Sequence, residues 1–256
     1  MDLREVLSVT RLTDSTFRSQ PPGTGFQFGG LTMAAALQAA AQTVAPEMGP
    51  KSLHTYFLRP GEWGTPVDLE IEELSNGRTF AARTVSAKQN DKTLAVMTTS
   101  FNSPRDGVEW QVSDLDGIAG PDDLSSIPVT LPVDDLIEVR PLSGSTALLP
   151  AQPLHPYWAR WLGTLEDANA QAAALAFISD YLVVRAIQKG GPEHDETTVR
   201  TLDQSVWFHH PADLEDWLLF STEPVSVSRG TGLTHGSVHT RAGLLVATFT
   251  QEVIFL

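Results

Sequence analysis

The sequence contains no cysteine, so a disulfide framework, a zinc site with cysteine ligands and a catalytic thiol are excluded. It also lacks any apolar run near the roughly 20 residues that a membrane-spanning helix needs. The N-terminus, Met1–Glu5, does not show the basic segment followed by an apolar segment that marks a signal peptide. We therefore expect a cytoplasmic protein without a membrane span.

Basic residues are few: 17 lysines and arginines stand against 31 aspartates and glutamates, which gives a formal net charge of −14. This balance argues against a broad nucleic-acid-binding surface, and nucleic acid is not expected as a partner. A local group of basic side chains could still hold one anionic ligand. The length of 256 residues is enough for two small domains.

The motifs of several enzyme classes are also missing. No Gly-x-Ser-x-Gly sequence is present, which argues against Ser-His-Asp hydrolysis. There is no Walker loop, and Gly23–Gly25 and Gly230–Gly232 lack the remaining glycine of a dinucleotide-binding loop. His209 and His210 are adjacent in a predicted strand, so their side chains point to opposite faces and do not chelate one metal. We expect no cofactor and no metal.

The sequence does contain an internal repeat. The stretch Ser205–Pro211 (SVWFHHP) matches His54–Pro60 (HTYFLRP), and the prolines that end the two stretches lie 151 positions apart. The same offset relates Leu94–Val96 to Leu245–Ala247. An offset that persists through several elements predicts a duplicated fold.

In the first half, one helix is predicted over Leu31–Val44. This run is apolar nearly all round, so the helix is expected to be buried. Alternating residues at Val67–Glu72 predict a half-exposed strand, and Asn76–Gly77 predicts a hairpin turn. The second half is expected to repeat this order, with a helical lead-in at Leu165–Phe177 and a central helix at Tyr181–Lys189 that Ser179 and Asp180 begin.

These patterns favour an α+β fold of the double hotdog type: two antiparallel sheets, each wrapped around a long central helix, fused in tandem. The N-terminal hotdog is expected over residues 1–103 and the C-terminal hotdog, which carries the catalytic residues, over residues 146–256. Residues 104–145 are rich in Asp, Ser, Pro and Gly and are expected to form a linker. An alternative is that residues 128–139 form a strand that opens the second half.

The two halves differ in their polar residues. Asp180, Thr201 and Gln251 correspond, 151 positions earlier, to a glycine, a proline and a serine. Gln251 lies on the apolar face of the last predicted strand, where an amide needs a hydrogen-bond partner. A carboxylate that accepts a proton, with a hydroxyl and an amide that orient a water, would form a water-activating site. The alternative is structural: Asp180 begins a helix and Gln251 is satisfied by the backbone.

Several segments resemble the bacterial acyl-CoA thioesterase II (TesB-like) family, over most of the chain except about residues 103–150. They are FGGLTMAAALQAA, HTYFLRPG, SNGRTFAARTVSAKQNDK, ISDYL, TLDQSVWFHHP and TQEV. The resemblance implies a double hotdog that hydrolyses acyl-CoA and forms a homo-oligomer. It also implies that Asp180 in ISDYL, Thr201 in TLDQS and Gln251 in TQEV hold a nucleophilic water. One departure is Gln204, which stands where the family usually has histidine.

Further residues are candidates for contacts with acyl-CoA. The backbone N–H of Gly30, at the start of the first helix, is a candidate oxyanion donor. Arg59, Arg78 and Arg83 are candidates for binding the CoA phosphates. Two rival functions are a non-catalytic acyl-CoA-binding module and a hotdog enoyl-CoA hydratase. The hydratase family has a histidine five residues after its catalytic aspartate, whereas Arg185 follows Asp180 at that spacing.

Overall fold

The computed structural model describes residues 6–20, 26–112, 115, 117–129, 136–142, 156–188 and 199–256. The helices are α2 (Gly29–Ala41), α3 (Ala168–Ser179), α4 (Val183–Gln188) and the 3-10 turn η1 (Pro121–Asp123). None of the described helices is long and apolar enough to cross a membrane. The strands are β1 (Thr10–Arg11), β2 (Thr16–Ser19), β3 (Phe26–Gln27), β4 (Gly49–Phe57), β5 (Gly61–Glu62), β6 (Val67–Asn76), β7 (Phe80–Gln89), β8 (Lys92–Asn102), β9 (Ile137–Pro141), β10 (Tyr157–Trp161), β11 (Val199–Phe208), β12 (Leu218–Ser228), β13 (Thr231–Thr240) and β14 (Leu245–Phe255).

The main sheet is one continuous antiparallel sheet of 12 strands, in the order β1-β2-β6-β7-β8-β4-β11-β14-β13-β12-β10-β9. The expectation of two separate sheets was therefore wrong. Strands β4 and β11 pair directly, from Tyr56 opposite Asp203 to Ser52 opposite Trp207. Because an edge strand leaves its N–H and C=O groups unpaired, joining two half-sheets at this seam removes two exposed edges. The short strands β3 and β5 pair separately.

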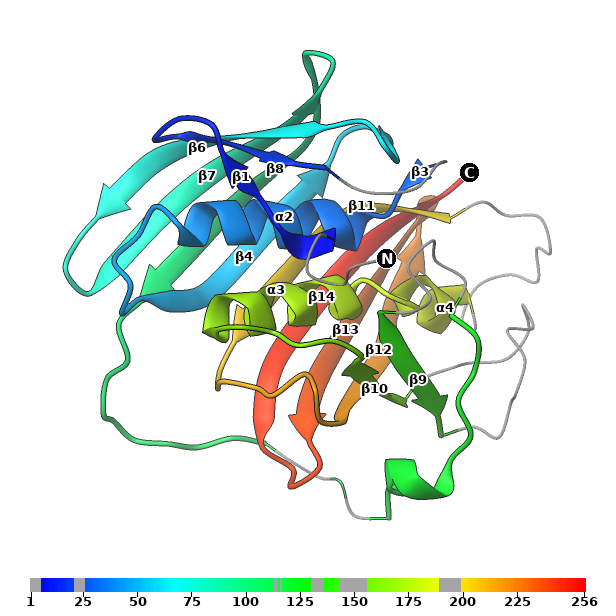
Figure 1. The fold of residues 1–256 in the computed structure, drawn as a ribbon. Helices are drawn as coiled ribbons and strands as arrows, with labels where there is room; N and C mark the ends of the chain where they lie inside the picture. The colour runs from blue at the N-terminus through cyan, green and yellow to red at the C-terminus, as the bar shows by residue number, and fades with distance from the viewer. Residues whose placement is uncertain are drawn as a thin grey trace.

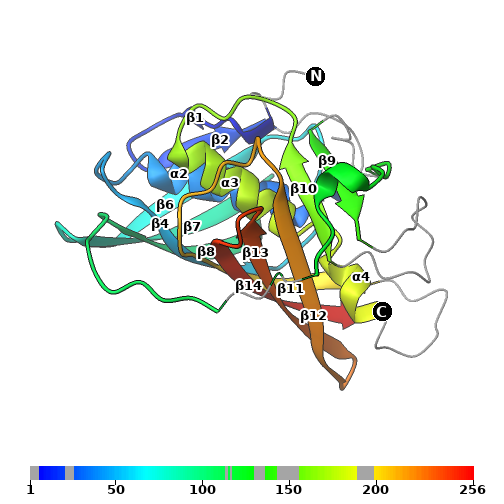
Figure 2. The same ribbon diagram turned by 90° about the horizontal axis from the view of Figure 1, so that it is seen from below.

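Helices α2 and α3 lie side by side on one face of this sheet (Figures 1 and 2). The prediction that the first helix is buried is confirmed, since all residues of α2 except Gly29 and Gln38 are buried. Helix α2 contacts α3 and strands β4, β6, β7 and β8. The core of the protein therefore lies between the two helices and the sheet that curves around them.

The duplication is visible in the irregularities of the strand pairing. Each of three register shifts in the first half recurs 151 positions later, at the same place in the matching strand. A bulge is one extra residue inserted at a defined point of a ladder, so three coincident bulges indicate two copies of one unit. The matching shifts are Pro50/Ser52 with Thr201/Asp203, Glu73/Ser75 with Pro224/Ser226, and Ala87/Lys88 with Val238/His239.

The second central helix does not lie where the sequence pattern placed it. The helix beside α2 is α3, the segment read as a lead-in, and Asp180 follows its last turn instead of opening a helix. Leu182 has a φ of 63°, a left-handed conformation that separates α3 from the short α4. Residues 180–198 connect α3 to β11, whereas only residues 42–48 connect α2 to β4. This longer connection breaks the 151-residue offset for the helices.

Residues 104–145, expected as a linker, include a strand of the main sheet. Strand β9 (Ile137–Pro141) pairs with β10 over five residues and forms the last strand of the sheet. It overlaps the alternative strand at residues 128–139. The boundaries of the two hotdog domains stay a prediction.

Candidate active site

Asp180 lies where the end of α3 meets the start of α2. Its side chain is 5% exposed, and its Oδ2 accepts a hydrogen bond of 2.6 Å from the backbone N–H of Gly30. The first N–H groups of a helix have no partner within the helix, and the local dipole favours a negative charge. Phe28, at the N-cap of α2, makes no side-chain capping bond. Asp180 of the second half therefore caps the helix of the first half.

The two glycines that begin α2 permit this close approach. A Cβ on Gly30 would lie 2.6 Å from the ring of Phe28 and 2.8 Å from the backbone oxygen of Phe177. A Cβ on Gly29 would lie 3.1 Å from Oδ2 of Asp180. Only a residue without a side chain fits at Gly30, whereas a side chain at Gly29 would require Asp180 or Phe57 to shift.

Gln251, in β14, is fully buried and contacts the same carboxylate. Its Nε2 donates to Oδ1 of Asp180 and also, at 3.0 Å, to Oε1 of Gln204. Gln204 in turn donates through its Nε2 to the hydroxyl of Ser179 at 2.9 Å. The Oε1 of Gln251 has no hydrogen-bond partner among the residues that the structure describes. The predicted Asp and Gln thus meet in one buried network.

Gln204 was noted in the sequence only as a departure from the family pattern. In the structure it lies directly opposite Gln251 in the pairing of β11 with β14, and it is fully buried. Residues opposite each other in an antiparallel pair share one face of the sheet. The sequence signal that could have found Gln204 is its apolar setting, since Val206 and Phe208 on the same face are buried.

Thr201 reaches the buried face of β11 because of the bulge between Thr201 and Asp203. Without the extra residue, Thr201 would point away from Gln204, because side chains alternate along a strand. With the bulge, Thr201 pairs with Val253, whose side chain is fully buried. The structure therefore places Thr201 on the same face as Gln204 and Gln251. Its hydroxyl makes no hydrogen bond to the described residues.

The ionisation of Asp180 is shifted by its surroundings. Burial raises the pKa of its carboxyl from 3.8 to about 6, and the hydrogen bonds from Gly30 and Gln251 oppose this shift. Burial dominates because removing water disfavours the charged form. Asp180 is consequently a carboxylate at neutral pH, with a pKa close enough to 7 for it to act as a general base.

The candidates for contacts with acyl-CoA fall at different places. The N–H of Gly30 already donates to Asp180, so it is not a free oxyanion donor in this structure. Arg59 is exposed and donates to the backbone oxygen of Thr93 at 2.8 Å. Arg59 lies two residues after Phe57, and the ring of Phe57 lies next to Gly29. Arg59 is therefore near the N-terminal end of α2.

Arg83 and Arg78 lie away from this junction. Arg83 is 1% exposed, and its guanidinium donates to Thr43, Ser75, Ala82 and Asn76, so it joins the end of α2 to strand β6. It is a structural residue with no donor left for a CoA phosphate. Arg78 lies in the exposed β6–β7 hairpin, which Figure 1 shows at the opposite end of α2 from Gly30.

Comparison with known proteins bears on this arrangement. Residues 18–102 match the family model of the acyl-CoA thioesterase N-terminal domain, and residues 112–255 match that of the C-terminal domain. The chain belongs to the TesB-like acyl-CoA thioesterase II family. It is 32% identical to acyl-CoA thioesterase 2 of Haemophilus influenzae, an alignment that covers 98% of this chain and 96% of the relative.

Solved structures share the fold. The tesB protein of Mycobacterium avium subsp. paratuberculosis matches with a TM-score of 0.84 and 30% identity, over 99% of this chain and 98% of that one. A hot dog fold protein of Alicyclobacillus acidocaldarius matches with a TM-score of 0.79 and 22% identity, over 99% and 97% of the two chains. The expected hotdog fold, α+β with a mostly antiparallel sheet, is confirmed by these matches.

Proposed function

We propose that this member of the TesB-like family hydrolyses acyl-CoA to a carboxylic acid and CoA, through a water held by Asp180, Thr201 and Gln251. The main support is the carboxylate of Asp180, which is buried, hydrogen-bonded on both oxygens and raised in pKa to about 6. A buried base of this strength at the junction of two hotdog units is suited to removing a proton from water.

The orientation of the Gln251 amide determines which of its atoms meets the water. Gln204 presents its Oε1 to Nε2 of Gln251, so the amide nitrogen faces Gln204 and Asp180. The oxygen of Gln251 is then the atom left to accept a hydrogen bond. Each carboxylate oxygen of Asp180 can accept a further hydrogen bond beside the one it already accepts. A water that donates to both groups keeps a lone pair directed at the substrate.

The reaction then follows from these contacts. The water oxygen attacks the thioester carbonyl carbon while its proton passes to Asp180. The tetrahedral intermediate expels the CoA thiolate, and the proton returns from Asp180 to the departing sulfur. The N–H of Gly30 positions the carboxylate in this scheme, and the hydroxyl of Thr201, which makes no hydrogen bond to the described residues, is a donor on the same face. No covalent enzyme intermediate is required.

The test is the release of CoA thiol from acyl-CoA, measured with a chromogenic thiol reagent. The protein adds no thiol of its own because it has no cysteine. Replacing Asp180→Asn should lower kcat by about 10² to 10⁴, the usual contribution of a positioned general base. Asp203→Asn is the matched control, because Asp203 lies on the opposite face of β11, beside Glu252. Negligible turnover by both wild type and Asp180→Asn, with acyl-CoA still bound, would instead indicate a non-catalytic binding module.

Assembly as a homo-oligomer stays a prediction. Analytical ultracentrifugation of the purified chain measures it directly, and a single species with the mass of one chain would contradict it.

A further inference from the structure

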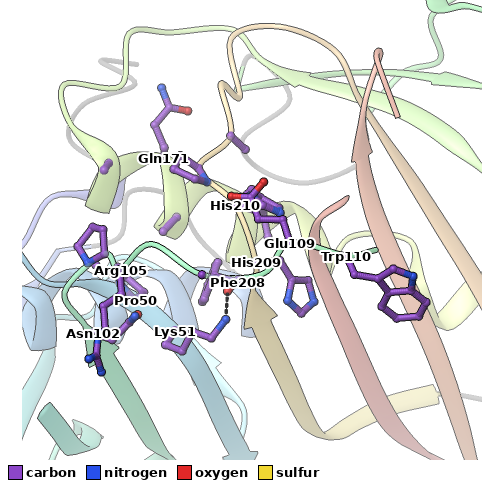
Figure 3. A pocket seen from close by; sticks show the side chains of 18 of the residues that line it. Pro50, Lys51, Asn102, Arg105, Glu109, Trp110, Gln171, Phe208, His209 and His210 are labelled. Atoms are coloured by element: carbon purple, nitrogen blue, oxygen red, sulfur yellow. Dashed lines mark hydrogen bonds between the residues drawn. The ribbon is translucent and has the colours of Figure 1, made fainter. Parts of the chain in front are cut away.

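A cavity of about 780 Å³ lies at the first turns of α3, at the opposite end of this helix from Asp180. Figure 3 shows the side chains that line it. The first two turns of α3, the start of β4, the end of β11 and part of the segment 102–110 line it. Its volume falls in the range of sites that hold a small molecule. None of the residues assigned to hydrolysis lines this cavity.

The position of the cavity is related to the proposed active site by the internal repeat. The lining residues Phe208–Ala212 correspond, 151 positions earlier, to Phe57–Gly61. The ring of Phe57 lies next to Gly29 at the start of α2, beside the proposed active site. Its wall at Pro50 corresponds, 151 positions later, to Thr201. Ala168 opens α3 as Gly29 opens α2. Helices α2 and α3 run antiparallel (Figure 1), so the duplicated units create two such junctions, and the cavity lies beside the start of α3, on the α3 side of the second one.

The catalytic side chains are absent from this second junction. Gln42 follows the last turn of α2 at the place where Asp180 follows α3, and it is exposed. Gln204 in β11 lies opposite Gln251 in β14. At the matching position of the first half, Leu53 in β4 lies opposite Thr99 in β8. Thr99, and not Ser100, is therefore the counterpart of Gln251. The start of α3 is capped by its own Asp167, which accepts from the N–H of Ala170 at 2.8 Å.

The lining of the cavity combines positive charge with apolar surface. Among the described residues that line it, Lys51 and Arg105 are the lysine and arginine, His209 and His210 are its histidines, and Glu109 is the one carboxylate, in a chain whose net charge is −14. Lys51 donates to the backbone oxygen of Phe208 at 3.0 Å, which uses one of its three N–H donors (Figure 3). The apolar part is made by residues of α3, β4 and β11, namely Ala172, Leu175, Pro50 and Phe208.

We propose that this cavity is a second, non-hydrolytic binding site for an anion that carries an apolar chain. This chemistry is shared by acyl-CoA and by the fatty acid that its hydrolysis releases. The anion contacts Lys51 and Arg105, and the chain lies against Phe208 and Leu175. The ligand class rests on the proposed function, whereas the existence of the site rests on the cavity and the repeat.

The experiment counts bound ligands by equilibrium dialysis with an acyl-CoA thioether, in which a methylene-linked sulfur replaces the hydrolysable thioester. We expect two thioether molecules per wild-type chain, and one per chain for the double variant Lys51→Glu with Arg105→Glu. Both side chains are exposed, so the double variant should fold, as circular dichroism would verify. Lys92→Glu, an exposed charge reversal outside the cavity, should retain two.

The outcomes separate this inference from the proposed function. The thioether cannot be hydrolysed, so its stoichiometry does not depend on whether Asp180 is the general base. Fatty acid that displaces a thioether molecule from wild type but none from the double variant identifies the second site as a product site, and the same result with CoA identifies it as a site for the carrier. One bound thioether in wild type, or two that both survive in the double variant, would overturn the second site.

Discussion

Replacing Asp180→Asn should change the pH dependence of stability by a predictable amount. The folded-state pKa of about 6 lies above the ordinary value of 3.8 expected in the unfolded chain. A raised pKa means that the folded state binds the proton more tightly. The protonated carboxyl therefore contributes stability in full below pH 3.8, and this contribution is lost as the pH rises through 6.

The size of the effect follows from the shift. A difference of about 2.2 pKa units, at 1.36 kcal/mol each, means that the ionised carboxylate reduces stability by about 3 kcal/mol at pH 7.5. About half of this loss is present at pH 5. The substitution removes the ionisation but also one acceptor, so either the N–H of Gly30 or the amide of Gln251 loses its partner. Such an unpaired buried group costs about 1 to 3 kcal/mol at every pH.

The two contributions separate by their pH dependence. At pH 4 we expect Asp180→Asn to be less stable than wild type by about 1 to 3 kcal/mol. At pH 7.5 it should equal wild type or exceed it by up to about 2 kcal/mol. Urea unfolding of both proteins from pH 4 to pH 8 measures this, with Asp14→Asn, an exposed carboxylate, as the control. A stability difference that stays constant over this range would refute the assignment of a buried, raised-pKa carboxyl to Asp180.

Three further predictions use the same network and its surroundings. Gln204→Leu introduces the residue found at the matching position of the first half, Leu53. It should lower kcat by about tenfold to a hundredfold, because the amide of Gln251 loses its orienting partner. An unchanged kcat in the thiol-release assay would contradict this. Arg83→Met should reduce the free energy of unfolding by about 3 kcal/mol or more and leave KM for acyl-CoA unchanged. A raised KM with unchanged stability would contradict the structural role of Arg83. The kcat/KM of wild type should fall about tenfold for each pH unit below about 6 as Asp180 is protonated, whereas a flat profile from pH 5 to pH 8 would exclude it as the base.

Local patterns were enough for much of the fold. The nearly all-apolar run that contains α2 predicted a buried helix, and alternation predicted strand β6, because both depend on which face of one segment meets the core. The offset of 151 positions was readable because matched turns and aromatic residues recur along the chain. The same offset predicted the wrong position for the second central helix, because the longer connection after α3 changes the spacing between this helix and its strands.

The sequence predicted only part of the candidate site. Asp180 and Gln251 were identified, but Asp180 was expected to open a helix, while it follows one and caps another. Gln204 could not be assigned a role, because its contact with Gln251 depends on the pairing of β11 with β14. The side of the sheet on which Thr201 lies depends on a single bulged residue, and alternation along the strand would have placed it on the wrong face.

By itself, the sequence determined a duplicated α+β chain with the candidate catalytic residues Asp180, Thr201 and Gln251 in its second half, because the repeat offset and the periodicity of each segment are readable along the chain. Only the tertiary structure decided that one sheet spans both halves and that the carboxylate of Asp180 meets the N–H of Gly30, 150 positions away. Such contacts depend on how helices and strands pack against one another, and packing between distant segments leaves no regular period in the sequence.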